Sequence, residues 1–343
     1  MAEWILWTGG MMLAGMLITL LFPSNARAAH HDTLREKIVI AHRAASGYLP
    51  EHTLEAVALA YGMGADFIEQ DLVLTKDKIP VVLHDIYLDT TTDVRRKFPD
   101  RARIDGRWYA IDFTLEEIKT LNVHERMYPT KDAAVFPKRF PVGRSHFAVP
   151  TLTEEIELIQ GLNKSMERNV GIYPELKIPA FHTQEGYDIG KIVLNTLASY
   201  GYFNSSANVY IQCFDTHYLK RLRFELSTQL PFIQLIGADG GYNRLMTAKG
   251  FDDVATYANG IGPSTDRLIR CDQQQLTMIM EPIKEAHNRG LVVHPYTFRK
   301  DSLPSYANSL EELFRMFYFI MGVDGVFTDF PDAAVKLLRA AGY

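Results

Sequence analysis

Residues 38–85 read IVIAHRAASGYLPEHTLEAVALAYGMGADFIEQDLVLTKDKIPVVLHD, and this stretch decides the fold. Short apolar runs in it lead into titratable side chains. His42 and Arg43 follow the first run, Glu69 and Asp71 lie within the second, and His84 closes the third. Apolar runs alone would indicate only buried strands. Runs that end in histidine, arginine and carboxylate residues are typical of a barrel mouth and favour a metal-assisted reaction on an anionic substrate.

Apolar runs and amphipathic stretches alternate along the rest of the chain. The pattern predicts an α/β fold, a parallel (β/α)8 TIM barrel. The predicted strands are Ile38–Ala41, Phe67–Leu74, Gly171–Leu176, Val209–Phe214, Phe232–Ile236, Gly260–Gly262, Leu291–His294 and Gly325–Phe327. The predicted helices are Thr53–Tyr61, Leu152–Leu162, Ile189–Tyr200, Thr216–Leu226, Asp252–Ala258, Gln274–Arg289 and Leu310–Met321. A doubly wound open sheet is the alternative, although Ala44-Ala45-Ser46-Gly47 lacks the glycine spacing of a dinucleotide site.

One segment interrupts the alternation. Val81–His84 is predicted as a short strand that forms a hairpin with the second strand. Residues 85–149 then form an insertion of the domain 37–340, helical around Leu115–Leu121, because they are too many for an ordinary strand-to-helix loop. The second half of the insertion is expected to be irregular, since it is interrupted by Pro129, Pro137, Pro141 and Pro150.

The N-terminal segment has a different character. Residues 5–22 are apolar apart from Thr and Gly, and Ala26-Arg27-Ala28 resembles the end of a secretory signal peptide. We expect cleavage after Ala28 and export to the periplasm or the medium. Because Glu3 is the only charged side chain before the run, an uncleaved membrane anchor through residues 5–22 is the alternative.

Composition excludes several classes of function. The formal net charge of the 343-residue chain is −5 and no basic run occurs, so nucleic-acid binding is not expected, whereas a small phosphoester needs only one or two cations. The two cysteines, Cys213 and Cys271, have no zinc-ligand spacing. We interpret them as buried thiols, and the sequence leaves a disulfide between them open.

Three carboxylates are candidate metal ligands. Glu69 and Asp71 are two positions apart on a predicted strand, so their side chains share a face, and Glu175 ends the next barrel strand. Such a set without thiols suits Ca²⁺ or Mg²⁺. The alternative for each carboxylate is a helix cap or an ion pair with arginine, which explains three at strand ends less well.

Two histidines and two cations complete the candidate site. His42 and His84 are candidate general acid and base, because imidazole titrates near neutral pH. Arg43 and Lys177 are candidates for gripping phosphate oxygens, or alternatively for neutralising the carboxylates. A single histidine beside an apolar run is more often a core residue, which is the expected state of His294.

Three further residues are supporting candidates. Glu51 could orient His42 or Arg43, or cap the helix that begins near Thr53. Phe214 and Tyr296, together with Phe298, follow predicted strands and could wall the pocket, although aromatic residues at strand ends more often only pack.

Several segments together resemble the glycerophosphodiester phosphodiesterase family, in particular its exported bacterial members. They are HRAASGYLPEHTLEA, FIEQDLVLTKDKIPVVLHD, GIYPELK, LVVHPYT and GVFTDFP, and the resemblance extends to FPDRARIDGRWYAIDFTLEEIK in the insertion. It implies a TIM barrel that cleaves deacylated phospholipids to sn-glycerol 3-phosphate and an alcohol. It also implies His42 and His84 as acid and base, calcium on Glu69, Asp71 and Glu175, and phosphoryl binding by Arg43 and Lys177.

The family usually reads His-Arg-Gly where this chain reads His42-Arg43-Ala44, so the Cβ of Ala44 would crowd the loop if a positive φ is needed there.

The expected partner is a small glycerophosphodiester, with membrane contact only through an uncleaved N-terminus. The oligomeric state stays open, a homodimer included. Two other functions remain as alternatives: a phospholipase D- or C-like barrel acting on intact phospholipid, which would need an exposed apolar rim, and a non-catalytic binding protein.

Overall fold

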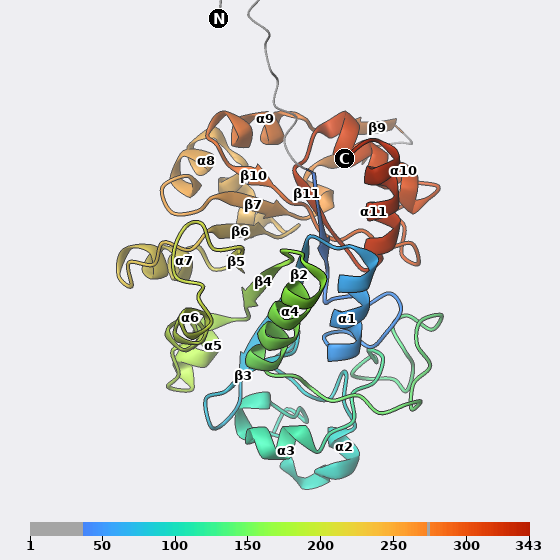
Figure 1. Cartoon of the computed structure of the whole chain (residues 1–343), viewed down its shortest axis with the longest axis vertical. Coiled ribbons are helices and arrows are strands. Elements are labelled where there is room, and N and C mark those ends of the chain that lie inside the picture. The colour runs from blue at the N-terminus through green and yellow to red at the C-terminus, as the bar shows by residue number, and fades with distance from the viewer. Residues whose placement is uncertain (1–36, 273–274) are drawn as a thin grey trace, which may run out of the picture. The chain divides into compact units, whose positions relative to one another are not determined.

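Eight parallel strands surround the centre of the fold in the computed structural model, which describes residues 37–272 and 275–343. In spatial order they are β10 (Val292–Val293), β7 (Gly260–Pro263), β6 (Phe232–Ile236), β5 (Ile211–Cys213), β4 (Gly171–Leu176), β2 (Phe67–Leu74), β1 (Ile38–Ala41) and β11 (Gly325–Thr328) (Figure 1). The predicted leader or anchor lies outside the described residues.

The barrel closes between β10 and β11. Beyond its pairing with β7, the segment that begins with β10 also bonds to β11: the Phe298 N–H donates to the Phe327 carbonyl at 2.9 Å, and the Asp324 N–H donates to the Val293 carbonyl at 3.1 Å. The predicted TIM barrel is therefore confirmed, and the alternative of an open sheet is wrong.

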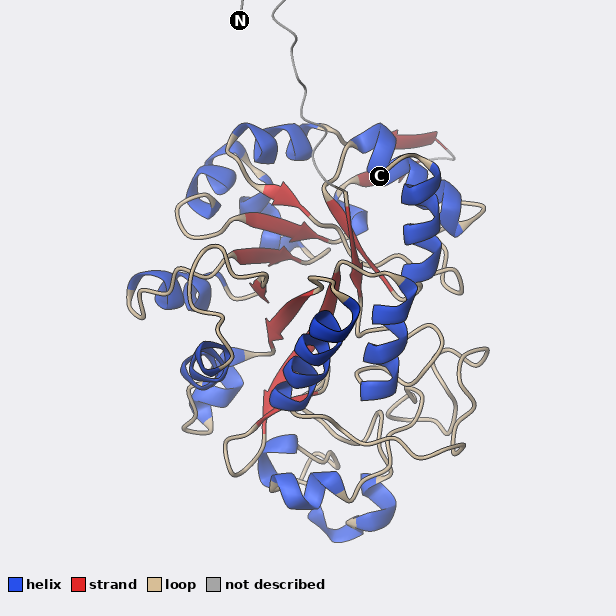
Figure 2. Ribbon diagram, viewed as in Figure 1, coloured by secondary structure: helices blue, strands red, loops and turns tan. Residues whose placement is uncertain are grey.

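Helices lie outside the strands, as Figure 2 shows in blue around red. They are α1 (Leu54–Met63), α4 (Leu152–Met166), α5 (Pro179–Gln184), α6 (Ile189–Ser199), α7 (Thr216–Phe224), α8 (Ala248–Val254), α9 (Glu281–Asn288), α10 (Leu310–Arg315), which continues as a π-helical turn (Met316–Met321), and α11 (Pro331–Ala340). Local signals set their ends. The Thr53 hydroxyl accepts from the Ala56 N–H at the start of α1, and Gly64 ends that helix with φ 95°. No helix among the described residues is long and apolar enough to cross a membrane.

The helix predicted over Gln274–Arg289 is wrong in its first part. Gln275–Met278 is strand β9, which pairs antiparallel with β8 (Ile269–Asp272). The helix α9 begins only at Glu281, because Pro282 lacks an N–H and is tolerated only in the first turn of a helix. Side-chain periodicity did not reveal that the preceding residues have a strand partner.

The barrel interior is apolar at one end and charged at the other. A buried cluster of Ile40, Phe67, Tyr173, Ile233 and Phe327 fills the lower part. Gly171 leaves room for it, since a Cβ there would lie 2.3 Å from the Phe67 ring. Side chains alternate along a strand, so Glu69 and Asp71 face inward above Phe67, and Glu175 faces inward above Tyr173. The charged layer therefore lies at the C-terminal ends of the strands.

The predicted hairpin is present, because β3 (Pro80–Val82) pairs antiparallel with β2. After it, residues 85–149 contain α2 (Val94–Lys97), α3 (Leu115–Lys119) and two 3₁₀ turns (Pro99–Arg101 and Ala110–Asp112), with α2 and α3 drawn below β3 in Figure 1. A capping box of Thr114 and Glu117 begins α3. A second apolar core joins this segment to the hairpin, and it includes Val73, Val81, Trp108, Phe113 and Phe147.

Candidate active site

The three candidate metal carboxylates meet at the barrel mouth. Asp71 and Glu175 are register partners on β2 and β4, and Glu69 lies two residues before Asp71. One oxygen from each of the three lies within 4.8 Å of the others, and all three side chains are buried. Lys177 Nζ lies 2.7 Å from Glu175 Oε1 and 3.3 Å from Asp71 Oδ1.

The raised pKa values of two of these carboxylates indicate that the cluster has too little positive charge beside it. Burial, followed by the charges of Asp71 and Glu175, raises the pKa of Glu69 well above its usual value. Burial likewise raises the pKa of Glu175 to about 7, against the lowering effect of Lys177. Asp71 Oδ1 is buried and has no partner in hydrogen-bond geometry among the described residues. The contact of this oxygen with Lys177 Nζ at 3.3 Å is an ion pair. Three converging hard oxygens of this kind fit a divalent cation.

His42 is held by a carboxylate that follows β11, the strand paired with β1. Its Nδ1 lies 2.6 Å from Asp329 Oδ1, and its Nε2 lies 3.8 Å from Glu69 Oε2. Asp329 follows β11, and Arg299 Nε is 2.7 Å from Asp329 Oδ2. Burial, then Arg43, lowers the pKa of His42 to about 4 although Asp329 raises it. The ring is therefore neutral at pH 7, with its Nδ1–H assigned to Asp329 and its Nε2 lone pair toward the cavity.

His84 has the same kind of support. Its Nδ1 lies 2.6 Å from Asp85 Oδ1, and the Thr90 hydroxyl donates to Asp85 Oδ2 at 2.7 Å. Burial and the charges of Arg43 and Lys177 lower the pKa of His84 to about 3. Each candidate histidine thus has one nitrogen fixed by a carboxylate and the other free for chemistry.

Arg43 lies in a loop with left-handed backbone. Its φ is 54°, and its N–H donates to Glu69 Oε2 at 2.8 Å. Its Nη1 is 3.1 Å from Glu51 Oε2, whereas its buried Nε makes no hydrogen bond among the described residues and forms an ion pair with Asp71 Oδ2 at 3.6 Å. Glu51 therefore contacts Arg43 and not His42, and Thr53 rather than Glu51 caps α1.

Ala44 is buried and has a φ of 64°, so the loop does need a positive φ at this position and adopts it with a Cβ in place. Its N–H donates to the Ala41 carbonyl at 3.1 Å, which holds the turn after β1.

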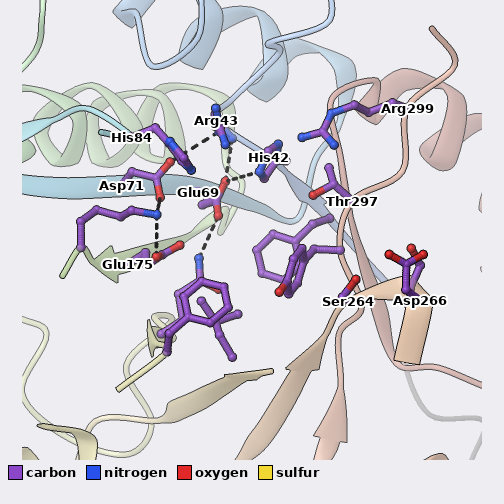
Figure 3. Close-up of a pocket in the computed structure, with 17 residues that line it drawn as sticks. His42, Arg43, Glu69, Asp71, His84, Glu175, Ser264, Asp266, Thr297 and Arg299 are labelled. Atoms are coloured by element: carbon purple, nitrogen blue, oxygen red, sulfur yellow. Dashed lines mark hydrogen bonds and ion pairs between the residues drawn. The ribbon is translucent and has the colours of Figure 1, made fainter. Parts of the chain in front are cut away.

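A cavity of about 350 Å³ opens among these residues. Figure 3 shows His84, Asp71 and Glu175 on one side of it and Ser264, Asp266, Thr297 and Arg299 on the other, with His42 and Arg43 between them. Phe214 and Tyr296 also line it, with ring centroids 6.1 Å apart. Phe298 does not; it packs in the core against Phe314 and Phe317.

A second cavity of about 390 Å³ adjoins the first. The two share His84, Glu175, Lys177 and Phe214. The second cavity is otherwise walled mainly by apolar and aromatic side chains, among them Ile86, Tyr87, Ile178, Pro179 and Tyr242.

A sequence model of the glycerophosphoryl diester phosphodiesterase family matches residues 42–333. The chain belongs to this family. The glycerophosphodiester phosphodiesterase of Haemophilus influenzae is 42% identical over 92% of this chain and 93% of its own length. That of Treponema pallidum is 36% identical over 88% and 92%.

Solved structures agree on the fold. A Silicibacter pomeroyi protein assigned as a glycerophosphoryl diester phosphodiesterase aligns with a TM-score of 0.70 at 25% identity, over 90% of this chain and 95% of that one. An Oleispira antarctica phosphodiesterase, solved in complex with the product sn-glycerol-3-phosphate, has a TM-score of 0.61 at 21% identity, over 89% and 97%.

The site of this family member also contains residues that the sequence analysis did not select. His52 Nε2 lies 2.7 Å from Asp71 Oδ2, and Gln212 donates to Glu69 at 2.8 Å. His52 and Asp85 lie within residues 38–85, and Asp329 lies in GVFTDFP. Their positions beside predicted strand ends could have indicated that they belong to the site.

His294 is buried in the barrel, where its Nδ1 is 2.8 Å from the Tyr173 hydroxyl, as expected for a core residue. Cys213 is a buried free thiol, and the side chain of Cys271 lies outside the described residues.

Proposed function

We propose that this protein hydrolyses glycerophosphodiesters to sn-glycerol 3-phosphate and an alcohol. The observation that carries the proposal is the arrangement of two carboxylate-supported histidines, His42 and His84, over a buried carboxylate triad in one cavity. Arg43 and Lys177 supply the positive charge that a phosphodiester needs, and both side chains line that cavity.

Glu69, Asp71 and Glu175 would hold the divalent cation, and we propose Ca²⁺ because flexible carboxylate cages suit it better than Mg²⁺. When bound, the ion would polarise the phosphoryl oxygens and offset the charge of the triad.

The cavities suggest which histidine does which task. His42 lines only the first cavity, whose far wall carries the hydroxyls of Ser264 and Thr297 and therefore suits a polyol. His84 borders both cavities, so it lies where the headgroup alcohol can leave toward the second. We therefore assign His42 as the base whose Nε2 takes the proton of the attacking hydroxyl or water. We assign His84 as the acid: its Nε2 first takes a proton from solvent and then passes it to the alcohol oxygen as the bond to phosphorus breaks, which returns the ring to the neutral form that its low pKa favours.

The first test is an assay on glycerophosphocholine with and without EDTA, followed by calcium or magnesium. We expect sn-glycerol 3-phosphate and choline to form, EDTA to abolish turnover and calcium to restore it. Turnover that is indifferent to chelation would overturn the metal assignment, and no turnover with any added metal would overturn the function.

The second test compares a poor and a good leaving group. Replacing either histidine by Ala should lower kcat for glycerophosphocholine by about 100-fold or more. With a glycerophospho-p-nitrophenyl ester, whose phenol needs little protonation, His84→Ala should regain most of the lost rate and His42→Ala should not. The reverse pattern would exchange the two assignments, and near-normal turnover of either variant would remove its histidine from the mechanism.

We also propose export, on the composition of residues 1–28. Sequencing the N-terminus of the mature protein from a fractionated bacterial host should give Ala29 in the periplasm or medium. A full-length chain that sediments with the membrane would favour the anchor instead.

A further inference from the structure

Arg126, on the insertion, contacts two carboxylates that support the site, Glu51 and Asp85. Its Nη2 and Nε lie 2.5 and 3.0 Å from the two oxygens of Glu51, and its Nη1 lies 2.6 Å from Asp85 Oδ2. Glu51 is the partner of Arg43, and Asp85 is the partner of His84. The guanidinium of Arg126 therefore bonds both to the carboxylate that holds Arg43 and to the carboxylate that holds His84.

Arg139, from the irregular second half of the insertion, supports the other histidine. Its Nη2 lies 2.7 Å from Asp329 Oδ2, and Asp329 Oδ1 in turn meets His42 Nδ1. Its other nitrogens contact Asp301 and the Ser46 carbonyl, and only 4% of its side chain is exposed. The guanidinium also lies 3.6 Å from the ring centroid of Phe136 on the same segment.

We propose that Arg126 and Arg139 are positioning residues, through which the insertion holds the two histidines and Arg43 in their working orientations. This inference rests on the proposed hydrolysis of glycerophosphodiesters. Neither arginine lines the main cavity, so each would act only through the carboxylate that it contacts. The insertion is then part of the catalytic apparatus, although the three metal ligands belong to the barrel.

The geometry requires guanidinium groups rather than any cation. Arg126 uses three nitrogens in one plane to bond two carboxylates from different segments, the loop after β1 and the loop after β3. A lysine ammonium would keep the charge but cannot reproduce this planar fork. Loss of such outer partners commonly lowers activity by about 10- to 100-fold.

The test measures kcat and KM of Arg126→Lys and Arg139→Lys, with Arg144→Lys on the exposed part of the same insertion as the matched control. Arg126→Lys should lower kcat and raise KM for glycerophosphocholine, each by about tenfold, because it loosens His84 and Arg43 together. Arg139→Lys should lower kcat by a similar factor and leave KM within about twofold, since Asp329 contacts His42 and not Arg43. Arg144→Lys should behave as wild type.

The dependence of the rate on the leaving group separates positioning from stability. If the two arginines only stabilised the fold, their replacement would lower the rate on both substrates equally. With the p-nitrophenyl ester, Arg126→Lys should regain rate as His84→Ala does, and Arg139→Lys should not, as with His42→Ala. Guanidinium ion added at millimolar concentration should partly restore Arg126→Ala and Arg139→Ala. If an arginine variant does not fold, Thr90→Val, which removes the hydroxyl that donates to Asp85, should show the leaving-group pattern of Arg126→Lys in weaker form.

The outcomes separate the two proposals. A wild-type protein that turns over neither substrate would overturn the proposed function. An active wild type with both lysine variants within about twofold of it would overturn the inference alone. A rate loss that is equal for both substrates in both variants, and is matched by a lower melting temperature, would also overturn it, because that pattern means general loosening of the fold.

Discussion

His42 depends on Asp329 for its orientation, because the 2.6 Å contact at Nδ1 leaves Nε2 as the free nitrogen. Asp329→Asn removes the charge and lets an amide N–H face Nδ1, which favours the wrong tautomer. We expect kcat to fall by about 100-fold or more while the far-ultraviolet circular dichroism stays unchanged. Asp332→Asn is the control, because Asp332 lies on α11 and accepts a hydrogen bond from the Tyr48 hydroxyl. Wild-type turnover of Asp329→Asn would show that His42 needs no carboxylate.

Ala44 combines a left-handed φ of 64° with a buried methyl group. Glycine would relieve about 1 kcal/mol or more of backbone strain, but it would lose a similar amount through chain entropy and the lost methyl packing. We therefore expect Ala44→Gly to change the free energy of unfolding by less than about 1 kcal/mol and kcat by less than about twofold. Urea unfolding and steady-state kinetics measure both. A large gain in kcat would mean that the methyl group distorts the loop that carries Arg43.

At the opposite end of the barrel, His287 of α9 contacts Asp324, the residue before β11. Asp324 Oδ2 lies 2.8 Å from His287 Nε2 and accepts from the Val293 N–H at 2.8 Å. Burial alone would raise the pKa of Asp324, but the hydrogen bond and charge of His287 lower it to about 2.

A folded-state pKa below the usual 3.8 stabilises the fold above pH 3.8, and this contribution is lost as the pH falls through about 2. We expect Asp324→Asn to cost about 2 kcal/mol of unfolding free energy at pH 7 and progressively less below pH 4. Urea titrations between pH 3 and 7 measure the difference. Asp252→Asn, in the exposed pair with Arg289, should cost much less. A cost for Asp324→Asn that does not vary with pH would contradict this account.

At the scale of the whole molecule, three buried carboxylates converge at the barrel mouth. A bound divalent cation would stabilise the native state and not the unfolded chain, so calcium in excess of its Kd should raise Tm by about 5–10 °C over the EDTA-treated protein. Differential scanning fluorimetry measures this shift independently of activity. Glu175→Gln should abolish the shift and Glu116→Gln, exposed on the insertion, should keep it. An unchanged Tm with calcium would argue against the metal site.

Local periodicity predicted much of the site. Alternation along β2 is a property of the strand alone, so it placed Glu69 and Asp71 on one face, and the ends of the first apolar runs predicted the positions of His42 and His84. The helix expected at Gln274 failed because the β8–β9 pairing depends on a partner segment, which side-chain periodicity within one stretch does not reveal.

The sequence by itself determined the barrel, the family and the groups available for chemistry, because strand alternation and strand ends are encoded over a few neighbouring residues. Only the tertiary structure decided how those groups are held. Closure of the barrel sets β11 beside β1 in parallel register, which brings Asp329 to His42 across 287 positions of sequence. Arg126 and Arg139 reach the site from a proline-interrupted insertion without periodicity, so nothing local indicated which carboxylates they would contact.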